Sequence, residues 1–172
     1  LERRTMNIFY FDEDPYVAAQ AQPDKLLVKM PLETAQMLCT AHRVTGCEDY
    51  ADEHNLYKTA YMNHPCTIWA RENQANYSWL YAHFLALGNE YTYRYDKVHA
   101  SLEKLADALL MLPTGLWDTS IQMSDIPQCM PDEYKNDDPI TAYRDYCINE
   151  KYYAKWEKGR DKPTWWEEIC HQ

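Results

Sequence analysis

The sequence predicts a mainly α-helical protein, a single-domain bundle of five or six helices with a short β-prone segment near the N-terminus. Three observations support this fold class. Apolar residues recur at helical spacing over several long segments. The chain has only four glycines, few for the many turns of an all-β protein, and its 172 residues are enough to close one core without disulfides. We expect residues 6–172 to form this domain and Leu1–Thr5 to be an extension or a cloning remnant.

The limits of the elements follow from their end signals. The β-prone run Ile8–Phe11 comes first and ends at a group of acidic residues. Asp14-Pro15 supplies an N-cap followed by proline at the first helical position, and Asp138-Pro139 repeats this device. Gly46 is typical of the residue just after a helix end. The helices that we expect span residues 16–21, 31–44, about 66–99, 101–112, 139–158 and 163–170.

Two segments between these helices are expected to be irregular. Residues 47–64 are acidic and lack a helical period, and residues 113–139 contain four prolines. A long ordered loop such as the one expected over residues 113–139 is often found around a functional site. Ser101 is expected to cap the helix that follows it, and Gly88 is a weak point of the longest helix.

The longest predicted helix carries polar side chains on the face that should be buried. Buried polar groups cost free energy unless they are paired, so this face lines a site, a buried network or solvent. Arg94 with Tyr91 and Lys97 could bind a planar or phosphorylated ligand. The alternative is an ordinary helix with an i, i+4 ion pair and inward-packed tyrosines. At helical spacing the stripe reads Asn76, Leu80, His83, Leu87, Glu90 and Arg94.

A second cluster of charged residues follows the first helix. A lysine close to an acid can act as a Schiff-base nucleophile when burial lowers its pKa, which makes Lys25 a candidate. Glu33, His83 and Glu90 are candidate general acids or bases, and Asn76 joins the substrate-binding candidates. A solvated charged turn is the alternative for this cluster. Its members are Asp24, Lys25, Lys29, Glu33 and Gln36.

Common catalytic and metal-binding motifs are missing from the sequence. The six histidines form no H-x-x-x-H or H-E-x-x-H pattern, and the six cysteines form no C-x-x-C pair. Metal binding would need residues that converge from distant parts of the chain, and we expect neither a metal nor a cofactor. The cysteines are expected to be reduced and packed as small core residues. No nucleophile-elbow, P-loop or dinucleotide-binding motif is present, and Cys39 with His42 is a pair that chance often produces.

The charge balance limits the classes of partner. A formal charge of −10 disfavours nonspecific nucleic-acid binding, although a local basic cleft is still compatible with it. No stretch approaches the length of a membrane span. We therefore expect a cytoplasmic protein, in the host cytoplasm if a phage encodes it, with no membrane partner.

The opening of the chain and several later blocks resemble an uncharacterised protein family of phages and aquatic bacteria. In that family the residue after Asp-Lys is often His, where this chain has Leu26. If that His were catalytic, this chain would be altered there. The matching blocks are Met6–Tyr10, Asp12, Asp14-Pro15, Asp24-Lys25, Val28–Met30, Glu33, Gln36, Thr40–Arg43, Asn63–Pro65, Trp69, Arg71, Asn76-Tyr77, Trp79-Leu80, Glu90-Tyr91, Tyr93–Tyr95 and Met130–Tyr134.

The last third of the chain also resembles the C-terminal part of phage pyrimidine-dimer DNA glycosylases. This likeness rests on Pro131, Glu133, Glu150-Lys151 and Lys162–Trp166. It implies a small helical enzyme that flips a nucleotide and attacks it through an N-terminal threonine amine. This chain has Met6-Asn7 and no such threonine, so Lys25 or Lys29 would have to replace that amine.

Three functional hypotheses follow from these observations. The first is a phage-type enzyme acting on a nucleic-acid base or nucleotide, with a DNA glycosylase as its sharpest form. The second is an acidic, non-enzymatic protein that engages a basic surface of a host protein through Tyr and Trp side chains. The third is a structural bundle with a buried polar network. The enzyme hypothesis requires His83, Glu90 and Arg94 to converge with Lys25 or Glu33 in one pocket.

Overall fold

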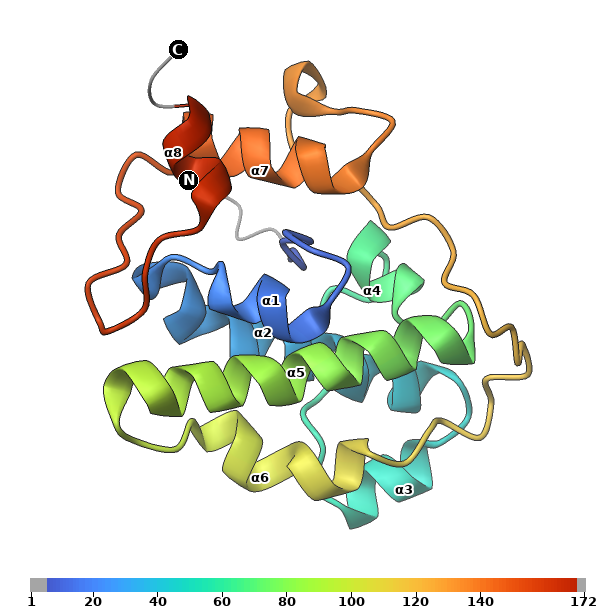
Figure 1. Cartoon of the computed structure of the whole chain (residues 1–172). Helices are drawn as coiled ribbons and strands as arrows, with labels where there is room; N and C mark the ends of the chain where they lie inside the picture. The colour runs from blue at the N-terminus through green and yellow to red at the C-terminus, as the bar shows by residue number, and fades with distance from the viewer. Residues whose placement is uncertain (1–5, 170–172) are drawn as a thin grey trace.

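The long helix α5 (Gln74–Tyr95) is the central element of the fold, and α1, α2 and α6 pack against it. In this computed structural model the described residues are 6–169, so Leu1–Thr5 and the end of the expected last helix lie outside them. Figure 1 shows α1 above α5, α6 below it and α2 crossing behind it. The other helices of this range are α1 (Pro15–Gln20), α2 (Asp24–Val44), α3 (Glu48–Glu53), α4 (Pro65–Trp69), α6 (Ala100–Leu109), η1 (Asp132–Tyr134), α7 (Pro139–Glu150) and α8 (Thr164–Ile169).

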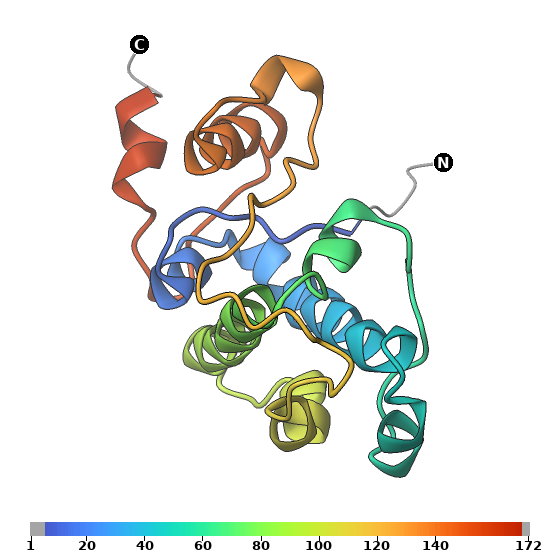
Figure 2. The ribbon, with the colours of Figure 1, turned by 90° about the vertical axis from the view of Figure 1, so that its right-hand side faces the viewer.

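The N-terminal segment separates two groups of helices. Figures 1 and 2 both show α7 and α8 at one end of the molecule and α3 and α6 at the other. Residues 6–11 lie between them, and their side chains are buried in the same hydrophobic core as those of α2 and α5. This segment therefore supports the C-terminal helices on the body of the protein.

The predicted fold class is confirmed, since the described residues form eight α-helices around one core. The number exceeds the expected five or six for two reasons. The acidic segment contains α3, and the single helix expected over 66–99 is split into α4 and α5. The side chain of Asn73 accepts the Asn76 N–H at 2.8 Å and so caps a new helix at this point. Among residues 6–169, no helix is long and apolar enough to cross a membrane.

The β-prone run near the N-terminus does not form a strand in the described part of the chain. The carboxamide oxygen of Asn7 accepts the N–H groups of Ile8 and Phe9 at 2.7 and 3.1 Å. Phe9 adopts a left-handed conformation with φ 55°, and the N–H of Phe11 bonds to its carbonyl at 2.9 Å. Local hydrogen bonds thus replace a ladder, and both faces of the run are buried.

Several predicted helix limits are wrong. α2 begins at Asp24 and continues through Pro31, whose ring is buried within the core. The cap of α6 is His99, whose Nδ1 accepts the Ser101 N–H at 3.1 Å. α7 ends at Glu150 and not at residue 158, and the carbonyl of Lys155 beyond it accepts the Asp24 N–H at the start of α2. The expected loop over 113–139 is confirmed and contains only the short η1 turn.

Candidate functional site

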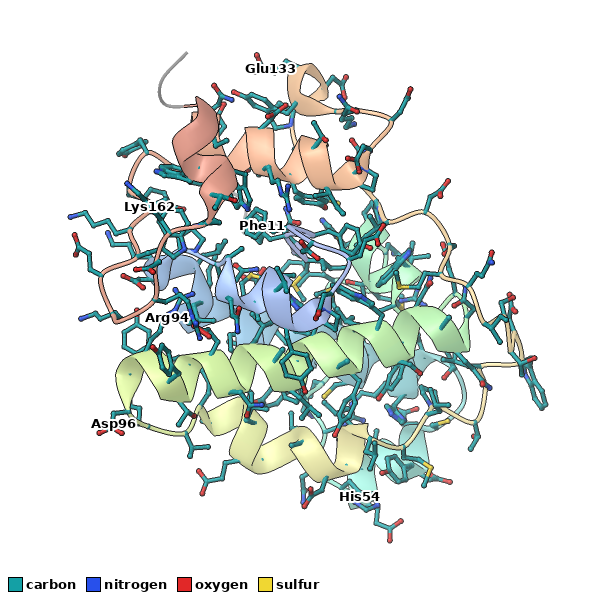
Figure 3. All side chains as sticks on the ribbon, in the orientation of Figure 1. Phe11, His54, Arg94, Asp96, Glu133 and Lys162 are labelled. Carbon is teal, nitrogen blue, oxygen red and sulfur yellow. The ribbon has the colours of Figure 1, made fainter. Side chains whose placement is uncertain are left out.

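The polar stripe of α5 ends in a buried ionic network centred on Arg94. The Arg94 side chain is 0% exposed and donates four hydrogen bonds. Its guanidinium meets Glu90 Oε1 and Asp24 Oδ1, both at 3.1 Å. It also meets the carbonyls of Gln22 and Gln20 at 2.6 and 2.8 Å. Arg94 therefore fixes α5 to the end of α1 and to the start of α2 (Figure 3).

A second arginine completes this network from the far end of the chain. Arg160 binds both carboxylate oxygens of Glu90, with Nε–Oε1 at 2.8 Å and Nη2–Oε2 at 3.0 Å. Its guanidinium lies 4.5 Å from the centre of the Tyr93 ring. The carboxylate of Glu90 raises the pKa of Arg160 above its ordinary value. Bidentate arginine–carboxylate pairs of this kind fix geometry as well as charge.

The second carboxylate of the network, Asp24, ties it to the segment between α7 and α8. Its Oδ2 accepts the Glu157 N–H at 2.8 Å, and its own N–H donates to the Lys155 carbonyl at 2.8 Å. The hydroxyl of Tyr95 donates to the Asp24 carbonyl at 3.0 Å. Two carboxylates thus balance two guanidiniums, which is the condition for keeping such charges in a protein interior.

A cavity of about 260 Å³ borders this network. Arg160 and Arg144 both line it, together with Asp12, Phe11 and Trp165. Figure 3 shows Phe11 between α1 and α7. Arg144 donates to the Phe11 carbonyl at 3.0 Å and contacts Asp12 at 3.4 Å. To residues 6–166, Nη1 of each arginine makes no hydrogen bond. The cavity therefore combines two anchored guanidiniums with aromatic walls, a combination suited to a phosphate and a planar base.

The charged residues of α2 form a separate, accessible stripe. Lys25, Lys29 and Glu33 follow one another at i, i+4 spacing and share one face of the helix. Lys29 Nζ lies 3.8 Å from Glu33 Oε2, and their side chains are 55% and 16% exposed. Lys25 is exposed and lies over the Tyr153 ring, with Nζ 5.6 Å from its centre. An amine beside a carboxylate on an open helix face could carry out nucleophilic and proton-transfer chemistry.

His83 is enclosed by protein in the middle of the α5 stripe. Its Nδ1 bonds to the Pro15 carbonyl at 3.0 Å, and its ring stacks on Trp79 with centres 5.0 Å apart. Its Nε2 is buried without a hydrogen-bond partner among the described residues. Burial lowers the His83 pKa to about 4, so the ring is neutral near pH 7. His83 and Arg94 together fasten both ends of α1 to α5.

The predicted substrate-binding residues have different surroundings. Asn76 is fully buried and binds the Trp69 carbonyl and both the hydroxyl and the N–H of Ser124. Tyr91 is nearly buried and stacks on Tyr95. Lys97 is exposed just beyond the end of α5. The structure therefore brings Glu90 and Arg94 together with Asp24, whereas Lys25 and Glu33 lie on the α2 stripe instead.

Sequence reasoning missed Arg160 and the cavity residue Arg144. Arg160 follows Gly159 in an irregular segment, and its partner Glu90 is 70 residues away. No local spacing indicates such a contact. For Arg144 the N-cap and proline at the start of α7 predicted the helix, but they did not predict its contact with Phe11.

These features define a small helical protein with an accessible amine–carboxylate stripe and a cavity lined by two arginines. The sequence model of the family described as pyrimidine dimer DNA glycosylase matches residues 6–104. The chain belongs to this family. No curated protein and no solved structure matches it. The matched range contains α1 to α5, the α2 stripe and the Asp24–Glu90–Arg94 part of the network, whereas Arg144 and Arg160 lie beyond it.

The comparison confirms the glycosylase likeness but places it in another part of the chain. The resemblance seen in the sequence was carried by residues 131–166, and the family match covers the N-terminal 6–104. The C-terminal segment is connected to the matched region through Arg160 and through the backbone contacts of Asp24.

Proposed function

We propose that this protein is a DNA glycosylase that attacks a damaged pyrimidine nucleotide through a lysine of α2. The observation that carries the proposal is the Lys29–Glu33 pair, because it places an amine beside a carboxylate on an open face of the family-matched region. The sequence indicated Lys25 as the candidate nucleophile, but the structure places its amine over the Tyr153 ring and not beside a carboxylate of the α2 stripe. The helical rise puts Lys25 and Glu33 about 12 Å apart along α2, so they would not form this pair. Lys29 is therefore the better-placed nucleophile.

The N-terminal residues of the matched region support a lysine nucleophile. Met6 and Asn7 are 1% and 6% exposed. The Asn7 carboxamide donates to the Cys129 carbonyl at 3.0 Å and accepts the Ile8 and Phe9 N–H groups. A nucleophile must reach C1′ of a flipped nucleotide, and the exposed Lys29 side chain meets this requirement.

The proposed reaction forms one bond and breaks another at the same carbon, C1′ of the sugar. The uncharged Lys29 amine bonds to C1′ of the sugar as the bond from C1′ to the pyrimidine nitrogen breaks. Glu33 accepts a proton from the attacking amine and passes it to the departing base, which takes the bonding electron pair. Opening of the sugar ring then gives an imine, which borohydride reduces to a stable amine link.

The cavity beside Arg160 is the proposed contact for the damaged strand. A phosphate can accept hydrogen bonds from the guanidinium groups of Arg144 and Arg160, and aromatic walls suit an unstacked base. With a net charge of −10 and two carboxylates on the cavity wall, we expect weak binding to undamaged duplex. Selectivity would then come from the damaged base, which is cheaper to unstack than a normal pair.

A trapping experiment tests this proposal. A labelled duplex with a single cyclobutane pyrimidine dimer is incubated with the protein and borohydride, and the covalent adduct is measured beside an undamaged duplex. The damaged duplex should give an adduct, Lys29→Ala should lower it at least tenfold, and Lys25→Ala should leave most of it. Lys104→Ala changes an exposed lysine on α6 and serves as the control. If the unaltered protein gives no adduct and breaks no C1′–N bond in the damaged duplex, the glycosylase assignment is refuted, and full trapping by K29A would refute the role of Lys29.

A further inference from the structure

Three potential metal ligands from distant parts of the chain meet beside the N-terminal segment. His64 and Cys66 come from the start of α4, and Cys129 comes from the long loop before α7. One ligand atom from each of the three lies within 4.8 Å of the other two. The two sulfurs are 3.3 Å apart. The cysteines are 63 residues apart in sequence, so no local motif indicated this group.

We propose that His64, Cys66 and Cys129 form a zinc site. Two thiolates and one imidazole are ligands that Zn²⁺ prefers, whereas Mg²⁺ and Ca²⁺ prefer carboxylate ligands. This inference is independent of the proposed glycosylase activity. Cys66 is 0% exposed, whereas His64 and Cys129 are partly exposed, so the group is accessible from one side. With three protein ligands, the fourth position of a tetrahedral ion is open to water.

The spacing of the sulfurs fits a metal better than a disulfide. Two thiolates at about 2.3 Å from a tetrahedral zinc ion are about 3.8 Å apart. The observed 3.3 Å needs an opening of about 0.5 Å to reach this geometry. A disulfide needs the same sulfurs to approach by about 1.3 Å, to a bond of about 2.05 Å. The two sulfurs therefore need to move less to bind zinc than to form a disulfide.

The backbone around Cys129 is already held in place. Its carbonyl accepts the Asn7 carboxamide at 3.0 Å, and its N–H donates to the Tyr143 hydroxyl at 3.3 Å. That hydroxyl donates in turn to the Pro127 carbonyl at 2.6 Å. Ligands oriented by such contacts lose little further freedom when a metal binds. The proposed zinc ion would join the loop to α4 at this point.

The two sulfurs lie 3.3 Å apart, so deprotonating both would place two negative charges side by side. A divalent cation would supply the positive charge that two adjacent thiolates need.

The role of His64 can be separated from its role as a helix cap. Its Nδ1 accepts the Cys66 N–H at 3.1 Å, so coordination through this atom would replace that hydrogen bond. Asn is also a good N-cap but a poor zinc ligand. His64→Asn therefore keeps the cap and removes the imidazole.

The test is a Zn²⁺ titration of the whole reduced, metal-free chain against a chromophoric chelator, with Co²⁺ as a spectroscopic probe. We expect one equivalent of tight binding and a thiolate-to-cobalt charge-transfer band. Cys129→Ser should weaken binding at least 100-fold, and His64→Asn should weaken it 10-fold or more. Cys147→Ser, which alters a buried cysteine outside the group, should bind as the unaltered protein does. Circular dichroism of each metal-free variant establishes that it is folded.

Two results would overturn the zinc assignment. The first is stoichiometric binding that persists in folded Cys129→Ser. The second is a lack of Zn²⁺ binding by the unaltered, reduced protein. Conversion of the two thiols into a disulfide, when hydrogen peroxide is added in a separate experiment, would then identify a redox pair in place of a metal site.

Discussion

Arg160 binds both oxygens of a carboxylate, that of Glu90, which lies 70 residues earlier in the chain and already pairs with Arg94 on its own helix. The Glu90 side chain is only 4% exposed. One carboxylate therefore links the family-matched helices to the C-terminal segment. The cavity wall formed by Arg160 depends on this link, so the integrity of the network and the shape of the cavity are coupled.

Glu90→Gln is expected to destabilise the fold strongly. The substitution removes the carboxylate that Arg160 binds and leaves Asp24 as the carboxylate that contacts Arg94, which is completely buried. Removing one partner of a buried ion pair typically costs about 3–5 kcal/mol of unfolding free energy. Urea unfolding measures this loss. Glu103→Gln, an exposed position on α6, should change stability by less than about 0.5 kcal/mol. Equal midpoints for the two variants would contradict a structural role of the network.

Arg160→Gln should have a smaller effect, of about 1–2 kcal/mol. Arg160 is 30% exposed, and its loss leaves the Glu90–Arg94 and Arg94–Asp24 pairs in place. Because Arg160 and Glu90 are in direct contact, the double variant should cost less than the sum of the single variants. A double-mutant cycle by urea unfolding gives this coupling energy. Strict additivity would show that the bidentate contact contributes nothing to stability.

The sequence was most informative where local chemistry decides the structure. Asp14 and Asp138 predicted the starts of α1 and α7, and their carboxylates accept the Tyr16 and Ile140 N–H groups as expected. The polar face of α5 was also recognised from spacing alone. The sequence left open whether this face lines a site, a buried network or solvent. The part of the face that contains Glu90 and Arg94 is a buried network.

The failures come from contacts that the sequence pattern does not show, some of them local and some between residues far apart in the chain. The β-propensity of Ile8–Phe11 was real, but no neighbouring strand is described, and the Asn7 side chain takes its amides. Pro31 argued for a helix start, yet packing carries α2 through it. Arg160 and Cys129 find their partners 70 and 63 residues away, and single-sequence patterns contain no information on such pairs.

Acidification should destabilise the protein through His83. Burial lowers its folded-state pKa from 6.5 to about 4, so folding favours the neutral ring. This stabilisation is complete above pH 6.5 and is lost as the pH falls toward 4, up to about 3 kcal/mol. Unfolding free energies measured from pH 7 to 4.5 should therefore fall less steeply for His83→Gln than for the unaltered protein. His54→Gln changes an exposed histidine and should keep the original slope. Parallel curves for H83Q and the unaltered protein would exclude His83 as the titrating group.

Gly88→Ala is expected to destabilise the protein although Ala is the better helix former. Gly88 is buried in α5, where a Cβ atom would overlap the side chain of Leu102 from α6. The gain in helix propensity is about 1 kcal/mol, whereas overpacking a core contact costs about 1–3 kcal/mol and outweighs it. Thermal and urea unfolding measure the net change. Leu102→Ala makes room for the methyl group, so G88A should be less harmful, or even stabilising, in the L102A background than in the unaltered protein. A G88A protein that is more stable on its own would show that Leu102 moves aside freely and that the close approach of α5 and α6 does not require glycine.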